Sequence, residues 1–305
     1  MSSVTLTESA KLALDELVAG VIENVISVNP MYHMLPFDGI EGNSLAYNRE
    51  NVLGDVQMAT VGDTITAKNP ASFTKVNSNL TTIIGDAEVN GLIQATRSVE
   101  TNQAAVQIAS KAKSAGRQFQ TMLITGDGTS NTFAGLGVLC DSGQKVDTGT
   151  NGGTLSFAFL DNLLDLVIDK DGQVDYIIMP PRTIRSYKAL VRSLGGVHAD
   201  DVYEMPSGMK VMAYSGVPIF RNDYMPINLT KGSGSNQTTI YAGTFDDGSR
   251  THGIAGLTAQ NDAGMIVEDV GIHQSRDEHI HRVKWYCGLA LFSLKGLALA
   301  DGITN

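Results

Sequence analysis

Three side chains that could bind a metal ion alternate in the stretch DEHIH, which contains Asp277, His279 and His281. Residues two positions apart on a β-strand point to the same face, and His273 lies close by in the sequence. Imidazole nitrogens and carboxylate oxygens bind zinc in proteins, so a metal-dependent enzyme that uses His279 and His281 is one hypothesis. The sequence contains neither an H-E-x-x-H motif nor a second ligand cluster, and an exposed polar strand explains the same alternation. We therefore keep the three residues as candidate metal ligands and predict no catalytic residue and no cofactor.

The glycine-rich stretch ITGDGTSNTFAGL, residues 124–136, could by composition be a phosphate-binding loop. A phosphate loop of this kind needs G-x-x-x-x-G-K-[ST] between a strand and the N-terminus of a helix. Here the glycines follow a helical pattern and no lysine accompanies them. The C-terminus of a helix also repels anions. The stretch is therefore predicted to end the helix and to turn the chain.

Two other short motifs begin like functional sites without meeting their requirements. Counting from Asp169, the stretch DKDGQVD places Val174 where a calcium-binding loop needs glycine, and no glutamate occupies position twelve. Ser215, in YSGVP, lacks the G-x-S-x-G context of a serine nucleophile. Turns explain both stretches, and the sequence favours an architectural role over catalysis.

The composition limits the classes of partner. The net charge of -10 disfavours general binding to nucleic acid, which depends on Lys and Arg. Charged residues make up 18%, below the usual ~25%, so much of the surface is uncharged and polar, which suits contacts between proteins. Cys140 and Cys287 are interpreted as buried thiols. The sequence has no secretory signal and no apolar run approaching the ~18 residues of a membrane span, so we expect a soluble protein without membrane contact.

Hydrophobic periodicity predicts the elements that would carry these residues. An amphipathic helix is predicted near residues 8–27, and short alternating segments from about 44 to 82 predict a β-rich arm with two strands. Apolar residues at steps of three and four predict a long helix from Arg97 to Thr125. Its stripe is rich in alanine and contains Phe119, which is typical of close packing against a sheet or another helix.

The remainder predicts a mixed α/β lobe followed by further strands. FAFLDNLLDLVI and RTIRSYKALVRSL are predicted helices, DYIIMP is a predicted buried strand, and MKVMAYSGVPIFRNDYMP is predicted to form two strands around a turn. NLTKGSGSNQTT is predicted to be a flexible polar loop before the strand TIYAGTF. Strands are predicted through MIVEDVGIHQSRDEHIHRVKWYCGLALF.

This order of elements, with several motifs, resembles the major capsid proteins of tailed bacteriophages, which have the Hong Kong 97 capsid fold. LITGDGTSNTFAGL is similar to the turn that leaves the long spine helix in that family. DYIIMPPRTIRSYKAL and GVPIFRNDYMP are similar to its strand, proline and helix unit and to its Gly-x-Pro strand, and EGNSLAYNREN precedes the arm. The resemblance covers nearly the whole chain, and its motifs are specific only in combination.

The resemblance implies a mixed α+β fold with four named parts. These are an N-arm at residues 1–43, an extended β arm called the E-loop at 44–85, a P-domain with the spine helix at 86–130 and 256–283, and an A-domain at 131–255 and 284–305.

The function implied by the resemblance is that of a major capsid protein, which self-assembles into the icosahedral head of a tailed bacteriophage around double-stranded DNA. The implied partners are further copies in hexamers and pentamers, a separate scaffolding protein, a portal and a decoration protein. The implied location is the virion, after assembly in the cytoplasm of the bacterial host. An encapsulin-type compartment shell of the same fold, which carries cargo enzymes instead of a genome, is the alternative.

The E-loop tip is expected at Lys68, Asn69 and Pro70, and these residues are candidates for contact between subunits. The surrounding stretch TAKNPAS has little apolar content with which to pack on its own domain. Some members of the family cross-link an E-loop lysine to an asparagine of a neighbour, which makes Lys68 a candidate donor. No asparagine partner can be assigned from the sequence, so we predict no cross-link.

Overall fold

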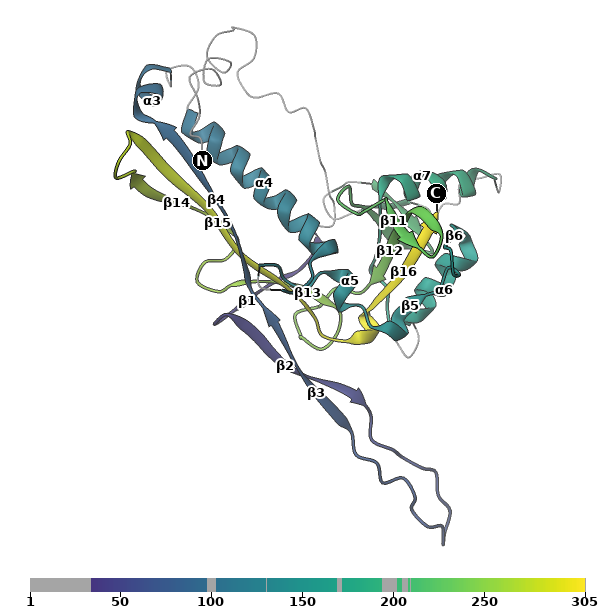
Figure 1. Ribbon diagram of the computed structural model, residues 1–305. Helices are drawn as coiled ribbons and strands as arrows, with labels where there is room; N and C mark the ends of the chain where they lie inside the picture. The colour runs from purple at the N-terminus through teal and green to yellow at the C-terminus, as the bar shows by residue number, and fades with distance from the viewer. Residues whose placement is uncertain are drawn as a thin grey trace.

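The computed structural model describes residues 34–97, 103–129, 131–168, 172–193, 202–204, 208 and 210–304. Within these residues the strands form two sheets and a two-stranded arm, and Figure 1 shows the arm projecting away from both sheets. The mixed α+β fold predicted from the sequence is confirmed. The helix predicted near residues 8–27 lies outside the described residues.

One sheet, here called the spine sheet, has five strands among the described residues. Its long strand β15 pairs with β4 and β14 on either side of its first half and with β13 along its second half. β1 adds to β13 in parallel. The bounds are β1 (Phe37–Ile40), β4 (Thr81–Asn90), β13 (Ile254–Ala259), β14 (Met265–Ile272) and β15 (Glu278–Leu291).

The long helix α4 (Gln103–Thr125) packs along the spine sheet (Figure 1). The ring of Phe119 lies 4.6 Å from the ring of Trp285 on β15, and both side chains are fully buried. The predicted end of the helix at Thr125 is confirmed. Arg97, the predicted start, lies on the helix α3 (Gly91–Arg97), and the residues between Arg97 and Gln103 are outside the described ranges, so the start stays a prediction.

The second sheet, here called the lobe sheet, has nine strands among the described residues, in the order β5-β16-β12-β7-β10-β9-β8, with β11 on β12 and β6 on β16. Figure 1 shows this sheet and its helices as a separate lobe beside the spine sheet. The bounds are β5 (Lys145–Val146), β6 (Gly153–Thr154), β7 (Tyr176–Met179), β8 (Val202–Glu204), β9 (Lys210–Tyr214), β10 (Val217–Arg221), β11 (Leu229–Lys231), β12 (Gly234–Gly243) and β16 (Leu297–Thr304).

Helices cover the lobe sheet and complete its core. On α6 (Phe157–Ile168), Leu160, Leu163 and Val167 recur at helical spacing and are buried against the sheet. The remaining described helices are α7 (Pro181–Ser193), α5 (Leu136–Leu139) and the 3-10 turns Ser142–Gln144 and Leu294–Gly296. The predicted helices and strands of this lobe are therefore confirmed, including the turn at Ser215, which has φ 51°.

The polar segment NLTKGSGSNQTT is not a flexible loop, contrary to the prediction. It forms the β11 and β12 hairpin, and β12 pairs with β16 along one edge and with β11 and then β7 along the other. Gln237 and Thr238 are consequently fully buried although both are polar. Partner strands distant in sequence satisfy their backbone groups, and local composition cannot reveal such partners.

The arm consists of β2 (Ser44–Val52) and β3 (Ser72–Asn79), joined by residues 53–71. The predicted two-stranded arm is confirmed. The predicted boundaries at 85/86, 255/256 and 283/284 fall inside β4, β13 and β15. The division of the chain into four parts stays a prediction.

Both cysteines are buried free thiols, as predicted. Burial raises the pKa of Cys140 to about 11 and that of Cys287 to about 12, so both thiols stay protonated at neutral pH. None of the helices among the described residues combines the length and the apolar content needed to cross a membrane.

Candidate inter-subunit arm and histidine cluster

The root of the arm is fixed to the end of β15. The Tyr47 hydroxyl donates to the carbonyl oxygen of Leu291 at 2.7 Å, and Arg49 Nε donates to the carbonyl oxygen of Phe292 at 3.0 Å. The rings of Tyr47 and Phe292 meet edge to face with centroids 5.2 Å apart. Leu80 also packs on this cluster. The arm therefore leaves the body in a defined direction.

Beyond the strands, polar contacts keep the two sides of the arm together. Asp55 N donates to the Asn69 carbonyl at 3.1 Å, and Gln57 Oε1 accepts from Thr66 N at 2.6 Å. The chain reverses at residues 60–63, where Asp63 Oδ2 accepts from Thr60 N at 2.7 Å. Gly62 adopts φ 98°, a left-handed conformation that favours glycine.

Lys68, Asn69 and Pro70 do not form the tip, contrary to the prediction. They lie part-way along the returning side of the arm, where Asn69 Nδ2 donates to Asp55 Oδ2 at 2.6 Å. Their side chains are exposed, so their role in contact between subunits stays a prediction. The tip is at residues 60–63 because the reversal needs a turn with a left-handed residue, which Gly62 supplies.

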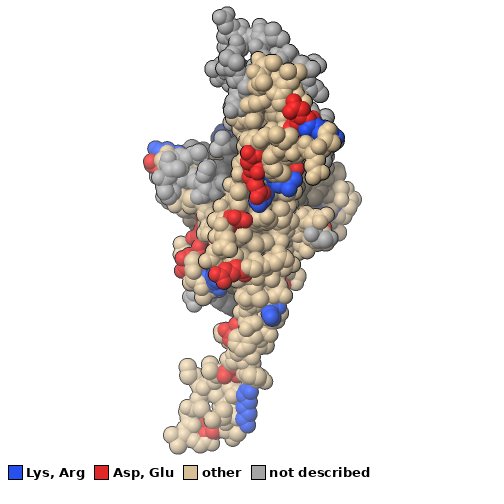
Figure 2. Space-filling view, turned by 90° about the vertical axis from the view of Figure 1, so that its left-hand side faces the viewer, with Lys and Arg blue, Asp and Glu red and all other residues tan. Residues whose placement is uncertain are grey.

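The arm exposes apolar side chains that the prediction, based on TAKNPAS alone, did not count. Val56, Met58 and Val61 are 95%, 101% and 106% exposed, so they contact almost nothing among the described residues. Figure 2 shows that the surface of the arm is mostly uncharged. In the fully described arm the exposed large apolar residues are Val52, Leu53, Val56, Met58, Val61, Ile65 and Phe73. Because exposed apolar patches mark interaction surfaces in other proteins, the arm is a candidate surface for contact between subunits.

The glycine-rich turn after α4 is a closed loop. Asp127 Oδ1 accepts hydrogen bonds from Thr129 N at 3.1 Å, from Thr129 Oγ1 at 2.8 Å and from Thr132 Oγ1. The hydrogen bond from Thr132, followed by those from Thr129, lowers the pKa of Asp127 to about 2. The Asp127 carboxylate already accepts the hydrogen bonds that a bound anion would need, which agrees with the prediction that this stretch is a turn and not a phosphate-binding loop.

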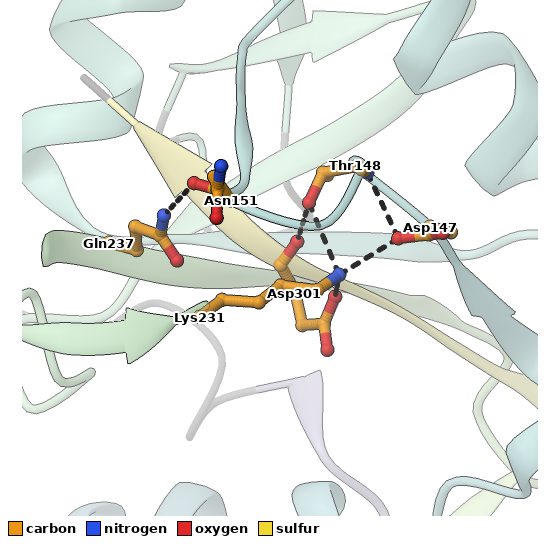
Figure 3. Close-up of polar contacts among 7 residues, drawn as sticks. Asp147, Thr148, Asn151, Lys231, Gln237 and Asp301 are labelled. Atoms are coloured by element: carbon orange, nitrogen blue, oxygen red, sulfur yellow. Dashed lines mark hydrogen bonds and ion pairs between the residues drawn. The ribbon is translucent and has the colours of Figure 1, made fainter. Parts of the chain in front are cut away.

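A polar network joins the loop at Asp147 and Thr148 to the strands β11 and β16 of the lobe sheet (Figure 3). Lys231 Nζ lies 2.6 Å from Asp301 Oδ1 and 3.0 Å from Asp147 Oδ1, and Thr148 Oγ1 donates to the Asp301 carbonyl at 2.6 Å. Partial burial acts to lower the pKa of Lys231, but the hydrogen bonds to Asp301 and Asp147 outweigh it and the pKa is raised. Lys231 therefore links β11 both to β16 and to the loop at Asp147.

The predicted ligands His279 and His281 do lie together on β15. Their ring centroids are 4.8 Å apart, and both rings face the side of the sheet that carries Trp285. The third member of the cluster is Asp269 on β14, with Oδ1 3.5 Å from His279 Nδ1 and 4.0 Å from His281 Nδ1. Asp277 precedes the strand and is outside the cluster, in which the ligand atoms lie within 4.8 Å of one another.

His273 is also outside the cluster, since its Nδ1 accepts from Ser275 N at 3.1 Å. Sequence reasoning missed Asp269 because its position depends on how β14 pairs with β15. That pairing includes a register shift between Asp269 and Gly271, which places Asp269 opposite His281.

No protein-family model matches the sequence, and no curated protein is similar to it in sequence. Comparison of structures gives clear matches along the whole chain. The SrpI encapsulin of Synechococcus elongatus PCC 7942, solved as a holo complex, matches with a TM-score of 0.75 at 18% identity, over 99% of this chain and 96% of that one. The Phage G major capsid proteins, solved with decoration proteins, match with a TM-score of 0.61 at 13% identity, over 100% of both chains.

The capsid of Myoviridae phage XM1 matches with a TM-score of 0.63 at 11% identity, over 95% of this chain and 97% of that one. The chain has the Hong Kong 97 capsid fold. The resemblance seen in the sequence is thereby confirmed for the fold. In this Hong Kong 97 fold the arm comes first, the long helix α4 follows it, and the lobe sheet comes after the helix, which is the order that the resemblance implied.

Proposed function

We propose that this chain is the major capsid protein of a tailed bacteriophage, which self-assembles into an icosahedral head around double-stranded DNA. The observation that carries the proposal is the arm: it is anchored at Tyr47, and its far part exposes apolar side chains that the described residues leave uncovered. Apolar surface in water is unfavourable by about 25 cal/mol per Å². A neighbouring copy that receives the arm removes this surface from water.

Shell geometry explains why such an arm is useful. Identical chains form a closed shell through heterologous contacts, in which one patch meets a different patch on the next copy. An arm that reaches beyond its own domain makes a contact of this kind and cannot satisfy itself. We propose that the copies assemble as hexamers and pentamers and that this arm is the E-loop.

The charge of the chain suits a container for DNA. At a net charge of -10, the protein offers few cations to phosphates, so packaged DNA is not held by many contacts. No sequence-specific binding is proposed. A separate scaffolding protein, a portal and a decoration protein are proposed partners, with the virion as location after assembly in the host cytoplasm.

An encapsulin-type shell is the second candidate, and one observation favours it. The TM-score to the SrpI encapsulin is 0.75, above the 0.61 and 0.63 to the capsids of Phage G and phage XM1. The two candidates share the fold and the arm and differ only in what the shell encloses. We place the capsid first because the motif of residues 123–136 and its companions resemble capsid sequences.

We propose a structural role and not an enzymatic one. The two cysteines are poor nucleophiles, because burial raises the pKa of each thiol to about 11 or about 12. The metal-dependent enzyme suggested by His279 and His281 is the least favoured candidate, since a shell subunit uses its spine sheet as a frame.

The test is electron microscopy of the expressed full chain across a salt series, with light scattering of the same samples. Salt is varied because exposed charges on a subunit of net charge -10 repel one another at low ionic strength. We expect closed particles, with and without a co-expressed scaffolding protein. Chains that stay monomeric under every condition, including with scaffold, would contradict the shell proposal.

The contents of the particles separate the two shells. Particles produced during infection are treated with nuclease, disrupted and assayed for protected DNA and for co-purifying enzymes. Protected DNA of uniform length supports the capsid. A stoichiometric cargo enzyme without DNA supports the encapsulin-type shell.

A further inference from the structure

The cluster of Asp269, His279 and His281 joins an edge strand to an interior strand of the spine sheet. β15 pairs with β4 on one side, where His279 is opposite Val89, and with β14 on the other side, where His281 is opposite Asp269. β14 has no further partner among the described strands. The two imidazoles therefore stand on a rigid frame, and the carboxylate comes from the more exposed strand.

One nitrogen of the cluster lacks a hydrogen bond. His279 Nδ1 is shielded from solvent and has no hydrogen-bond partner, although part of the ring is exposed. Its nearest charged neighbour is Asp269 Oδ1 at 3.5 Å, and that oxygen already accepts from Gly271 N at 2.9 Å. A shielded nitrogen without a partner is costly, and a metal ion would satisfy it.

The spacing fits one ion after small side-chain movements. Zinc binds imidazole nitrogen and carboxylate oxygen at about 2.0–2.2 Å, so two ligand atoms at the tetrahedral angle on one ion lie about 3.4 Å apart. The 3.5 Å from Asp269 Oδ1 to His279 Nδ1 already fits this spacing, and the 4.0 Å to His281 Nδ1 exceeds it by roughly half an ångström. The three ligand atoms lie within 4.8 Å of one another, so rotation of the two partly exposed rings and of the exposed Asp269 side chain must bring the most distant pair closer by roughly 1 Å.

A cavity beside the cluster leaves room for a further ligand. Its volume is about 430 Å³, and it is lined by His279, His281, Ile272 and Val89, with Ala104 from α4. Three protein ligands leave a fourth tetrahedral position, which water can fill. Three protein ligands beside a cavity differ both from a closed four-ligand zinc site and from a simple ion pair on the surface.

We propose that Asp269, His279 and His281 bind one divalent transition-metal ion of the zinc class, which fastens the edge strand β14 to β15. The proposal does not depend on what the shell encloses. Imidazole with carboxylate favours zinc and cobalt over magnesium or calcium, which prefer oxygen ligands alone. The alternative without a metal is a cross-strand Asp–His ion pair, which contributes little to stability.

The test is titration of the purified, metal-free full chain with Co²⁺, followed by visible absorption and by displacement with Zn²⁺. We expect a tetrahedral cobalt spectrum that saturates at about one ion per chain, as three N and O ligands with water would give. His279→Ala, His281→Ala and Asp269→Asn should each weaken binding at least about tenfold. His252→Ala, an exposed histidine outside the cluster, should bind as the wild type does.

Thermal melting provides a readout that does not rely on the cobalt spectrum. Zn²⁺ should raise the melting temperature of the wild type and of His252→Ala but not of the three cluster variants, because a ligand stabilises only the state that binds it. Asp269→Asn keeps an acceptor for Gly271 N, so it should fold even if the histidine variants do not. Saturable binding that survives Asp269→Asn and the double change His279→Ala with His281→Ala, or no binding by the wild type, would overturn the proposal.

Discussion

Tyr47, in the arm, donates its hydroxyl hydrogen bond to the carbonyl oxygen of Leu291 at 2.7 Å, across 244 positions of sequence. This contact separates the arm into two parts with different roles. The root is packed on the body at Phe292, whereas the side chains beyond Val52 are exposed. Folding of the body and assembly of the shell should therefore respond to different substitutions.

Removing the apolar surface of the arm should impair assembly and leave folding intact. The triple change Val56→Ser, Met58→Ser, Val61→Ser alters side chains that contact almost nothing in their own chain, so unfolding should change by no more than about 0.5 kcal/mol per site. Each substitution removes about 1.5–3 kcal/mol of the free energy gained when that side chain is buried on a neighbouring copy, which is enough to lower the yield of closed particles more than tenfold. Urea unfolding and electron microscopy measure the two effects.

Val138→Ser serves as the control for that triple change, since Val138 is 57% exposed and outside the arm. Its particles should form normally. A triple variant that assembles like the wild type would remove the arm from the proposed contact.

Phe119→Ala should destabilise the body strongly, and Phe73→Ala should not. Phe119 is 1% exposed and its ring lies 4.6 Å from Trp285 and 5.5 Å from Phe133, so its removal leaves a cavity and should cost about 3–5 kcal/mol. Phe73, on the arm, is 65% exposed and should change unfolding by less than about 0.5 kcal/mol. Denaturant unfolding of both variants measures the change in the free energy of unfolding, and equal losses for the two variants would contradict the structure.

Glycine at position 126 is required by packing, whereas glycine at 116 is not. A Cβ at Gly126 would overlap the carbonyl oxygens of Phe133 and Met122, so Gly126→Ala should destabilise the turn and the start of the lobe. A Cβ at Gly116, inside α4, meets nothing within 4 Å. Gly116→Ala should therefore stabilise the helix by about 0.5–1 kcal/mol. Thermal melts should move in opposite directions.

Asp127 should make stability depend on pH at the acid end. Its pKa is lowered from 3.8 to about 2, first by the hydrogen bond from Thr132 and then by those from Thr129. Because the folded pKa is below the unfolded one, the ionised carboxylate stabilises the folded state above about pH 4, and this contribution is lost as the pH falls toward 2. Asp127→Asn should show a shallower loss across this window.

Urea unfolding at a series of pH values measures that difference, with the exposed Asp165→Asn on α6 as control. The control should keep the slope of the wild type. Identical slopes for Asp127→Asn and the wild type would show that the loop does not depend on this carboxylate.

Local patterns in the sequence were enough for much of the fold. The period of three and four residues around Phe119 located the end of the long helix, and the run DYIIMP located β7. The alternating stretches before and after residue 62 located the arm. These features depend on residues close in sequence, which a periodic pattern records directly.

The polar segment NLTKGSGSNQTT and the tip of the arm were predicted less well, each for its own reason. The polar segment containing Gln237 is a buried strand because β11 and β16 flank it. The tip of the arm was displaced from Lys68 to residues 60–63, since the turn follows the left-handed Gly62 and the hydrogen bonds of Asp63.

The sequence by itself determined the kinds of element, their order, the turn after Thr125 and the two histidines on one strand face, because each depends on neighbouring residues. Only the tertiary structure decided that Asp269 meets His281 and that Val56, Met58 and Val61 are not covered by the part of the chain that the structure describes. The first depends on the shifted register between β14 and β15. The second depends on what packs against the arm, and burial is a property of distant contacts that local composition does not encode.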